Sequence, residues 1–96
     1  MRRVLAAAIG LGSVAAAVVA SAEPPAGAAS CTGCHPASSR VSSPVPRLAG
    51  LERGAIVKAM QDFRAGQRAG TVMDRIAKGF TDDEIQAIAA WYAAQK

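Results

Sequence analysis

The stretch CTGCH, residues 31–35, contains both cysteines and the only histidine of the 96-residue chain. Three kinds of chemistry use such a cluster: a disulfide, a metal site built from side-chain ligands, and the covalent attachment of a haem. They differ in what the rest of the chain must supply. The residues on either side of CTGCH therefore decide which of the three applies.

The beginning of the chain has the layout of a secretory signal peptide. Two arginines at positions 2 and 3 precede an uncharged apolar run, and residues 20–22, ASA, match the small-x-small pattern of a cleavage site. We expect cleavage after Ala22, with Ala26 and Ala29 as alternative sites. An uncleaved anchor is the other interpretation, because the charge-free run over residues 4–22 approaches the about 17–25 residues that a spanning helix needs.

A chain cleaved after Ala22 has 74 residues and a formal net charge of +2 instead of +4. Domains that bind nucleic acids usually carry a strong basic stripe, so this low charge gives no reason to expect a nucleic-acid partner. A domain of this length buries little apolar surface and typically needs a disulfide, a metal or another staple. We therefore predict an exported periplasmic domain over residues 23–96, with no membrane association after cleavage.

Hydrophobic spacing predicts only helices in this domain. Apolar side chains at three- and four-residue steps predict a helix over residues 51–65, ended by Gly66; they are Leu51, Ala55, Ile56, Ala59, Met60 and Phe63. Thr81 and Glu84 predict a capping box for a helix over residues 82–95, with the apolar stripe Ile85, Ile88, Ala89 and Tyr92. Shorter helical turns are expected over residues 26–31 and 73–78. The fold class is all-α, and its large apolar side chains are too few for a complete core.

The cysteine spacing separates the three chemistries. A disulfide between Cys31 and Cys34 would close a very small loop and restrain the unfolded chain little. Zinc would need about four nitrogen or sulfur ligands, whereas the cluster offers three. In C-x-x-C-H, both thiols bond to the vinyl groups of a haem and the histidine ligates its iron. We therefore predict one haem c, covalently bound through Cys31 and Cys34, with His35 as an iron ligand.

Two further residues are candidates for the haem site. A thioether opposite the histidine raises the reduction potential and closes the iron to outside ligands. Met73, in the loop before the last helix, is the predicted distal ligand, whereas Met60 on the apolar stripe is better explained as a core side chain. A ligating imidazole also needs an acceptor for its other ring nitrogen. The Pro46 carbonyl can serve, although this proline can equally do no more than turn the chain.

With CTGCH, VPRLAG (residues 45–50) and MDRIAKGF (residues 73–80) before a C-terminal helix, the chain resembles class I c-type cytochromes. Within them it is most similar to the monohaem cytochrome subunit of flavocytochrome c sulfide dehydrogenases and to one half of cytochromes c4. The resemblance implies short helices and loops wrapped around a covalently attached haem. It also implies thioethers at Cys31 and Cys34, the axial ligands His35 and Met73, and a Pro46 carbonyl that orients His35.

The same resemblance implies that Trp91 or Tyr92 packs across the N-terminal helix, and that an FAD-containing sulfide dehydrogenase subunit donates the electrons. Pro36 stands where the family usually has glycine, and the N-terminal helix is very short, which suits a subunit stabilised by a partner. We expect an electron-transfer protein that is not itself an enzyme. A free carrier that serves an oxidase or reaction centre is the alternative. A gas-binding haem sensor, in which Met73 does not ligate, is another.

Overall fold

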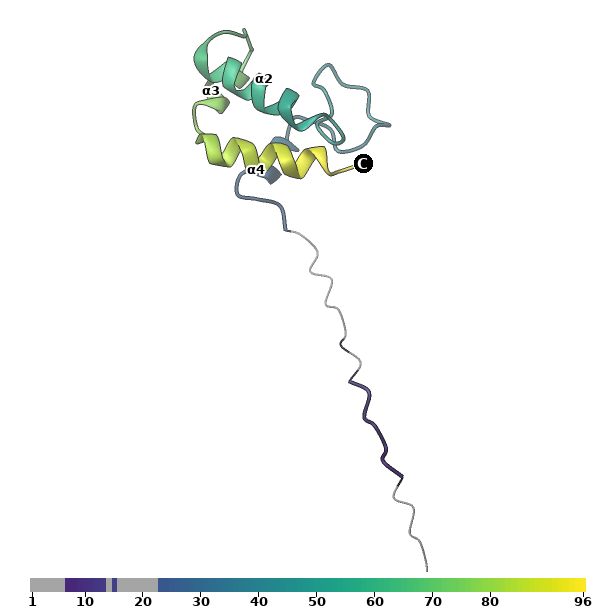
Figure 1. The fold of residues 1–96 in the computed structure, drawn as a ribbon. Helices are drawn as coiled ribbons and strands as arrows, with labels where there is room; N and C mark the ends of the chain where they lie inside the picture. The colour runs from purple at the N-terminus through teal and green to yellow at the C-terminus, as the bar shows by residue number, and fades with distance from the viewer. Residues whose placement is uncertain (1–6, 14, 16–22) are drawn as a thin grey trace, which may run out of the picture.

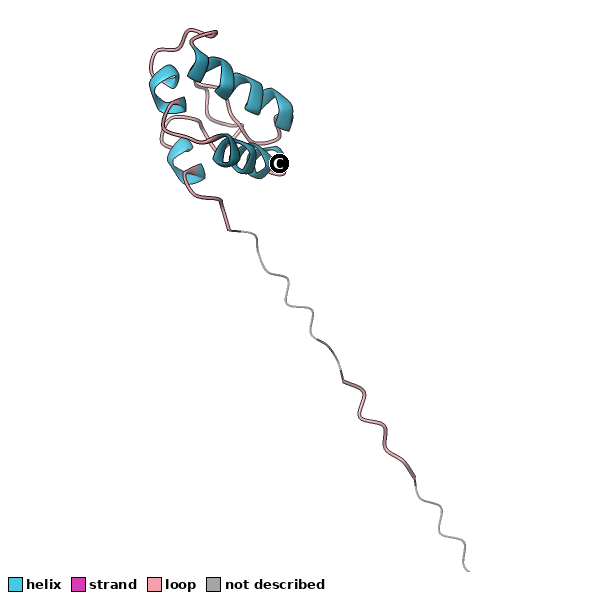
Figure 2. Cartoon of the chain, turned by 60° about the vertical axis from the view of Figure 1, so that its left-hand side comes forward, coloured by secondary structure: helices cyan, strands magenta, loops and turns pink. Residues whose placement is uncertain are grey.

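The computed structural model describes residues 7–13, 15 and 23–96, and every regular element within them is a helix (Figure 1, Figure 2). The helices are α1 (Ala28–Cys31), α2 (Arg53–Ala65), α3 (Met73–Ala77) and α4 (Asp82–Ala93). This confirms the predicted all-α class. Most of the predicted signal peptide, residues 1–22, lies outside the described residues, and its described part is exposed coil at residues 7–13. None of the helices described here has the length and apolar character to cross a membrane.

Helix α2 begins two residues later than its hydrophobic spacing predicts, because Glu52 caps it. The two carboxylate oxygens of Glu52 accept hydrogen bonds from the Gly54 and Ala55 amides, each at 2.9 Å. These bonds satisfy two of the amides that the first turn of a helix leaves without partners. The helix ends where the sequence predicts, at Gly66, whose φ of 75° is a left-handed conformation that glycine adopts without steric cost.

Helix α4 begins with the predicted capping box. The Thr81 hydroxyl accepts from the Glu84 amide at 3.2 Å, and the Glu84 carboxylate accepts from the Thr81 amide at 3.1 Å. Asp82 and Asp83 add negative charge at the positive end of the helix dipole. The helix ends at Ala93, two residues before the predicted end.

Helices α2 and α4 lie beside one another, and α3 connects them at one end (Figure 1). The buried cluster combines α1, α2 and α4 and includes the whole predicted stripe of α4: Ala28, Ile56, Val57, Ile85, Ile88, Ala89 and Tyr92. The predicted stripe of α2 behaves differently. Only Ile56 of its six members is buried, since most of that stripe faces a cavity instead of α4.

The single turn of α1 crosses α4, and small buried residues form the contact. Ala28 and Ala89 are fully buried, and the Tyr92 hydroxyl donates a hydrogen bond to the Ala28 carbonyl. Gly27 precedes this turn with a φ of 85°, and a Cβ there would lie 2.6 Å from Phe80 Cε1. Of the two aromatic residues predicted to pack across the N-terminal helix, Tyr92 therefore makes the buried contact, and Trp91 packs partly buried against the same cluster.

Candidate haem site

An apolar cavity of about 860 Å³ lies between α1, α2, α3 and the start of α4. All six residues of the predicted α2 stripe line it, which explains why this face of α2 is apolar although only Ile56 is buried. The remaining walls come from the CTGCH turn, the loop that ends at Pro46 and Leu48, and the segment from Arg68 to Ile76. Residues far apart in the sequence thus surround one cavity. Its volume lies in the range of about 300–1,000 Å³ typical of ligand and cofactor sites.

The CTGCH turn forms one end of the cavity. Helix α1 stops at Cys31, and the amides of Cys34 and His35 both donate to the Cys31 carbonyl, at 3.2 and 2.9 Å. This tight turn brings Cys31, Cys34 and His35 to the cavity together. Both cysteines are free thiols; Cys31 is half-buried against the core and Cys34 is exposed.

His35 is held in one orientation from the outside of the cavity. Its Nδ1 lies 2.6 Å from the Pro46 carbonyl oxygen. A carbonyl oxygen can only accept, so Nδ1 carries the hydrogen and Nε2 of the neutral ring has a free lone pair. This is the arrangement in which a histidine acts as a metal ligand. The structure therefore contains the contact that was predicted between His35 and Pro46, while the role of His35 as an iron ligand stays a prediction.

Both methionines of the helical domain line the cavity, and their surroundings differ. Met60, in α2, also packs against the buried cluster. Met73 is the first residue of α3 and, among the described side chains, is not one that packs against this cluster. Both thioethers therefore border the cavity, and the choice of Met73 over Met60 as the distal ligand stays a prediction.

The wall near Met73 rests on a loop that the sequence does not predict in detail. After Gly66, the amides of Gln67 and Arg68 both donate to the Asp62 carbonyl, at 2.8 and 3.2 Å, and turn the chain back over α2. Arg68 then lies over the Phe63 ring, 4.8 Å from its centroid. Among the described residues that line the cavity, Arg68 is the one cationic side chain. Residue spacing alone could not place Arg68 there, because its position over Phe63 depends on the loop.

Comparison with known proteins places this site in a family. No protein-family model matches the chain. The cytochrome subunit of sulfide dehydrogenase from Chlorobaculum tepidum is 43% identical over 63 residues, which are 66% of this chain and 57% of that protein. Cytochrome c4 from Pseudomonas aeruginosa is 34% identical over 92% of this chain and 44% of its own length. The chain thus spans only about half the length of these two relatives.

A third relative is matched over most of its length. Cytochrome c-554(548) from Halomonas halodenitrificans is 31% identical over 70 residues, which are 69% of this chain and 84% of that protein. The chain belongs to the class I c-type cytochromes. The structure has the predicted helices, and the relatives are c-type cytochromes. The resemblance stated from the sequence is therefore confirmed at the level of the family.

The lining of this cytochrome's cavity fits the chemistry of a haem. Two free thiols and an imidazole with a free Nε2 stand at one end, and a thioether stands in another wall. Three large apolar side chains of the cavity are open to solvent: Leu51 at 42%, Val72 at 50% and Ile76 at 44%. Exposure of this kind is unfavourable unless an apolar body covers it. A porphyrin is such a body, and it would complete the core that the chain lacks.

The two thiols of this cytochrome differ in their surroundings. Burial raises the pKa of the Cys31 thiol, while a hydrogen bond with Tyr92 lowers it and is the smaller effect. Burial likewise raises the pKa of Tyr92, and the adjacent Cys31 adds to this. The Cys31 thiol and the Tyr92 hydroxyl, which both lie between α1 and α4, therefore stay neutral at pH 7. The exposed Cys34 is the more accessible of the two.

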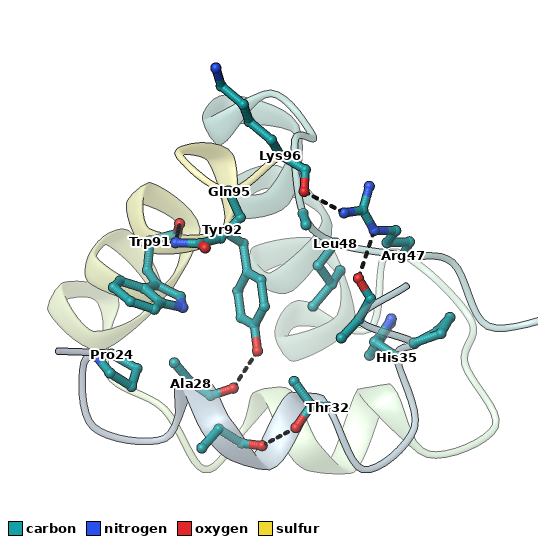
Figure 3. Close-up of a pocket in the computed structure, with 14 residues that line it drawn as sticks. Pro24, Ala28, Thr32, His35, Arg47, Leu48, Trp91, Tyr92, Gln95 and Lys96 are labelled. Atoms are coloured by element: carbon teal, nitrogen blue, oxygen red, sulfur yellow. Dashed lines mark hydrogen bonds between the residues drawn. The ribbon is translucent and has the colours of Figure 1, made fainter. Parts of the chain in front are cut away.

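A second hollow, of about 330 Å³, shares His35 and Leu48 with the cavity and is otherwise lined mainly by α1, by the segment after His35 and by the end of the chain (Figure 3). Tyr92 points across it toward Ala28, and Arg47 spans its other edge between Lys96 and the segment after His35. It contains neither of the cysteines and neither of the cavity methionines. Arg47, at its edge, directly follows Pro46, whose carbonyl contacts His35.

Proposed function

We propose that this cytochrome carries one electron at a time in the periplasm, as the haem subunit of a flavocytochrome c-type sulfide dehydrogenase. The observation that carries the electron-transfer part is the meeting of Cys31, Cys34, His35 and Met73 around one apolar cavity. The sulfide part is supported by the 43% identity to the cytochrome subunit of sulfide dehydrogenase.

In this proposal each residue has a defined role. Cys31 and Cys34 would hold the haem through thioethers, and His35 Nε2 and the Met73 sulfur would ligate its iron. A haem c bound there would supply a one-electron iron couple. The apolar cavity walls would surround the porphyrin, and the Met73 thioether would raise the reduction potential and leave no position open to an outside ligand.

The distal ligand is tested by comparing Met73→Ala with Met60→Leu in the haem-loaded protein. We expect Met73→Ala to remove the thioether-to-iron charge-transfer band of the ferric form and to lower the midpoint potential. Met60→Leu conserves apolar volume in the core and should leave both unchanged. Loss of the band in Met60→Leu alone would make Met60 the ligand. Absence of the band from the unmutated protein as well as from both variants would favour a five-coordinate, gas-binding haem.

The chain itself is not an enzyme in this proposal, because sulfide oxidation takes place on an FAD-containing partner that passes electrons to the haem. A partner-dependent subunit is supported by the small buried cluster and by the single turn of α1. The test is to size the native protein from a periplasmic extract while following haem and flavin absorbance together.

Co-elution of haem and flavin at several times the mass of this chain, followed by haem reduction on addition of sulfide, is the expected result. A red peak at the mass of the monomer, without flavin, would overturn the sulfide dehydrogenase assignment and leave a free carrier. Other redox proteins, such as an oxidase or a reaction centre, would then be the partners to test.

Export is tested on the same material. We propose cleavage of residues 1–22, so N-terminal sequencing of the purified cytochrome should begin at Glu23. A start at Gly27 or Ser30 would identify one of the alternative sites. Recovery of the whole chain, including Met1, from the membrane fraction would contradict cleavage and make the segment an anchor.

A further inference from the structure

Arg47 joins three segments behind the candidate iron ligand. Its Nε donates to the Ala37 carbonyl at 3.0 Å, and its Nη2 donates to the main-chain oxygen of Lys96 at 2.6 Å (Figure 3). The side chain is partly buried. It follows directly on Pro46, whose carbonyl accepts from His35 Nδ1. Arg47 thus adjoins the one contact that orients His35.

The hydrogen bonds of His35 with Pro46 and of Arg47 with Ala37 link the same pair of chain segments. Ala37 lies two residues after His35, and Arg47 lies one residue after Pro46, so the bonds from His35 to Pro46 and from Arg47 to Ala37 lie next to each other and run in opposite directions. The loop between these segments does little to hold them together. Its recorded hydrogen bonds are local, with acceptors at Ser38 and Ser43 only two or three residues from their donors.

We propose that Arg47 is a positioning residue that sets the hydrogen bond between His35 Nδ1 and the Pro46 carbonyl, and through it the donor strength of His35 toward iron. The proposal rests on the proposed role of His35 as a haem ligand. A planar guanidinium donates along two fixed directions at once, which a lysine ammonium cannot reproduce. Outer hydrogen bonds to a ligating imidazole fix its orientation and raise its basicity. A looser bond therefore makes His35 a weaker donor, which disfavours ferric iron.

The test is Arg47→Lys in the haem-loaded full chain, because this variant keeps the charge and removes the two-point contact. We expect two changes. The His35 Nδ1 proton, followed by NMR, should exchange with solvent about fivefold faster, as the loss of one ordinary hydrogen bond would produce. The midpoint potential should rise. Arg40→Lys is the matched control: Arg40 lies in the same exposed loop, its side chain has no recorded hydrogen bond among the described residues, and neither quantity should change.

If a folded Arg47→Lys variant showed unchanged His35 proton exchange and an unchanged midpoint potential, the proposal would be wrong. Arg47 would then only link neighbouring segments of the chain. A measurement on the unmutated protein covers the case in which that variant does not fold. On heating, the Arg47 Nε proton and the His35 Nδ1 proton should become exchangeable together. A His35 proton that stays protected after the Arg47 proton exchanges would equally overturn the proposal. Failure of the proposed function has a different signature, since the unmutated protein would then show no histidine-ligated haem.

Discussion

The crossing of α1 with α4 and the cavity beside α2 are both apolar, but the polypeptide alone fills only the crossing. At the crossing, Ala28 and Ala89 have no exposed surface and Tyr92 is 7% exposed. Around the cavity, Leu51, Val72 and Ile76 remain about half exposed. The crossing depends on small residues that allow two main chains to approach. The cavity depends on large residues arranged around a space of haem size.

This difference separates two sources of stability. Contacts at the crossing belong to the polypeptide, so their loss should weaken a protein that still binds haem. The exposed cavity walls would gain apolar contacts from a bound haem, so the loss of its attachment should affect most of the molecule. Four changes of decreasing expected effect test that division.

The largest effect is expected for the double variant Cys31→Ala and Cys34→Ala. Without its thioethers the chain loses the haem, and the remaining buried cluster is too small to fold a domain of this length. Haem absorbance after denaturing electrophoresis should disappear, and the helical circular dichroism should show no cooperative thermal transition. Thr32→Ala, within the same motif, should retain both. A cooperative transition in the double variant would show that the cavity side is stable without haem.

Gly27→Ala should be the most damaging change at the crossing. The new Cβ would meet Phe80 at 2.6 Å and Gly27 has a φ of 85°, so we expect a loss of roughly 3 kcal/mol in the free energy of unfolding. Gly66→Ala is the matched control, since its φ is 75° but its Cβ would have no described atom within 4 Å. It should cost about 1 kcal/mol. Equal losses in denaturant titrations would mean that the crossing is not tightly packed.

Tyr92→Phe tests the hydrogen bond of the crossing without changing its shape. It removes the donor to the Ala28 carbonyl and should reduce the free energy of unfolding by about 1 kcal/mol. The haem spectrum should not change, because Tyr92 belongs to the second hollow and not to the cavity. Tyr92→Leu, which also removes the ring, should cost more, and a change in the haem spectrum of Tyr92→Phe would contradict the division.

The same variant should alter the response to alkaline pH. Burial raises the pKa of Tyr92 above its usual 10.0, so the folded protein keeps a proton that the unfolded chain releases. Stability is therefore lost as the pH rises above 10.0, and the loss continues until the pH passes the folded-state pKa. Tyr92→Phe should flatten this part of the stability curve. An unchanged slope would show that other groups cause the alkaline loss.

The smallest effect is expected for Arg64→Met. Arg64 donates to the Phe80 carbonyl at 3.2 Å and pairs with the Asp82 carboxylate, which fastens the end of α2 to the start of α4. The pair is largely solvated, with side-chain exposures of 31% and 70%, so we expect a loss of about 0.5 kcal/mol at low salt and less at high salt. Lys58→Met, which breaks only an exposed pair within α2, is the control. A loss above that of Tyr92→Phe would reverse the order proposed here.

The sequence by itself determined the all-α class, the CxxCH motif and, to within two residues, the bounds of the helices. These features depend on interactions over a few residues: the Thr81–Glu84 capping box, Gly66 as a helix stop, and the spacing within CTGCH. The start of α2 was predicted two residues early. A glutamate at this position is not among the strongest N-cap residues, so its double hydrogen bond to the first turn left little signal in the sequence.

Only the tertiary structure decided which distant groups meet. Residues alone left open whether Pro46 orients His35, which is 11 positions away, and whether Trp91 or Tyr92 reaches the first helix, across 64 positions from Tyr92 to Ala28. Periodicity showed that α2 has an apolar face without showing that this face borders a cavity. Helical spacing describes one element at a time, whereas these contacts depend on how irregular loops bring several elements together around the space for a cofactor.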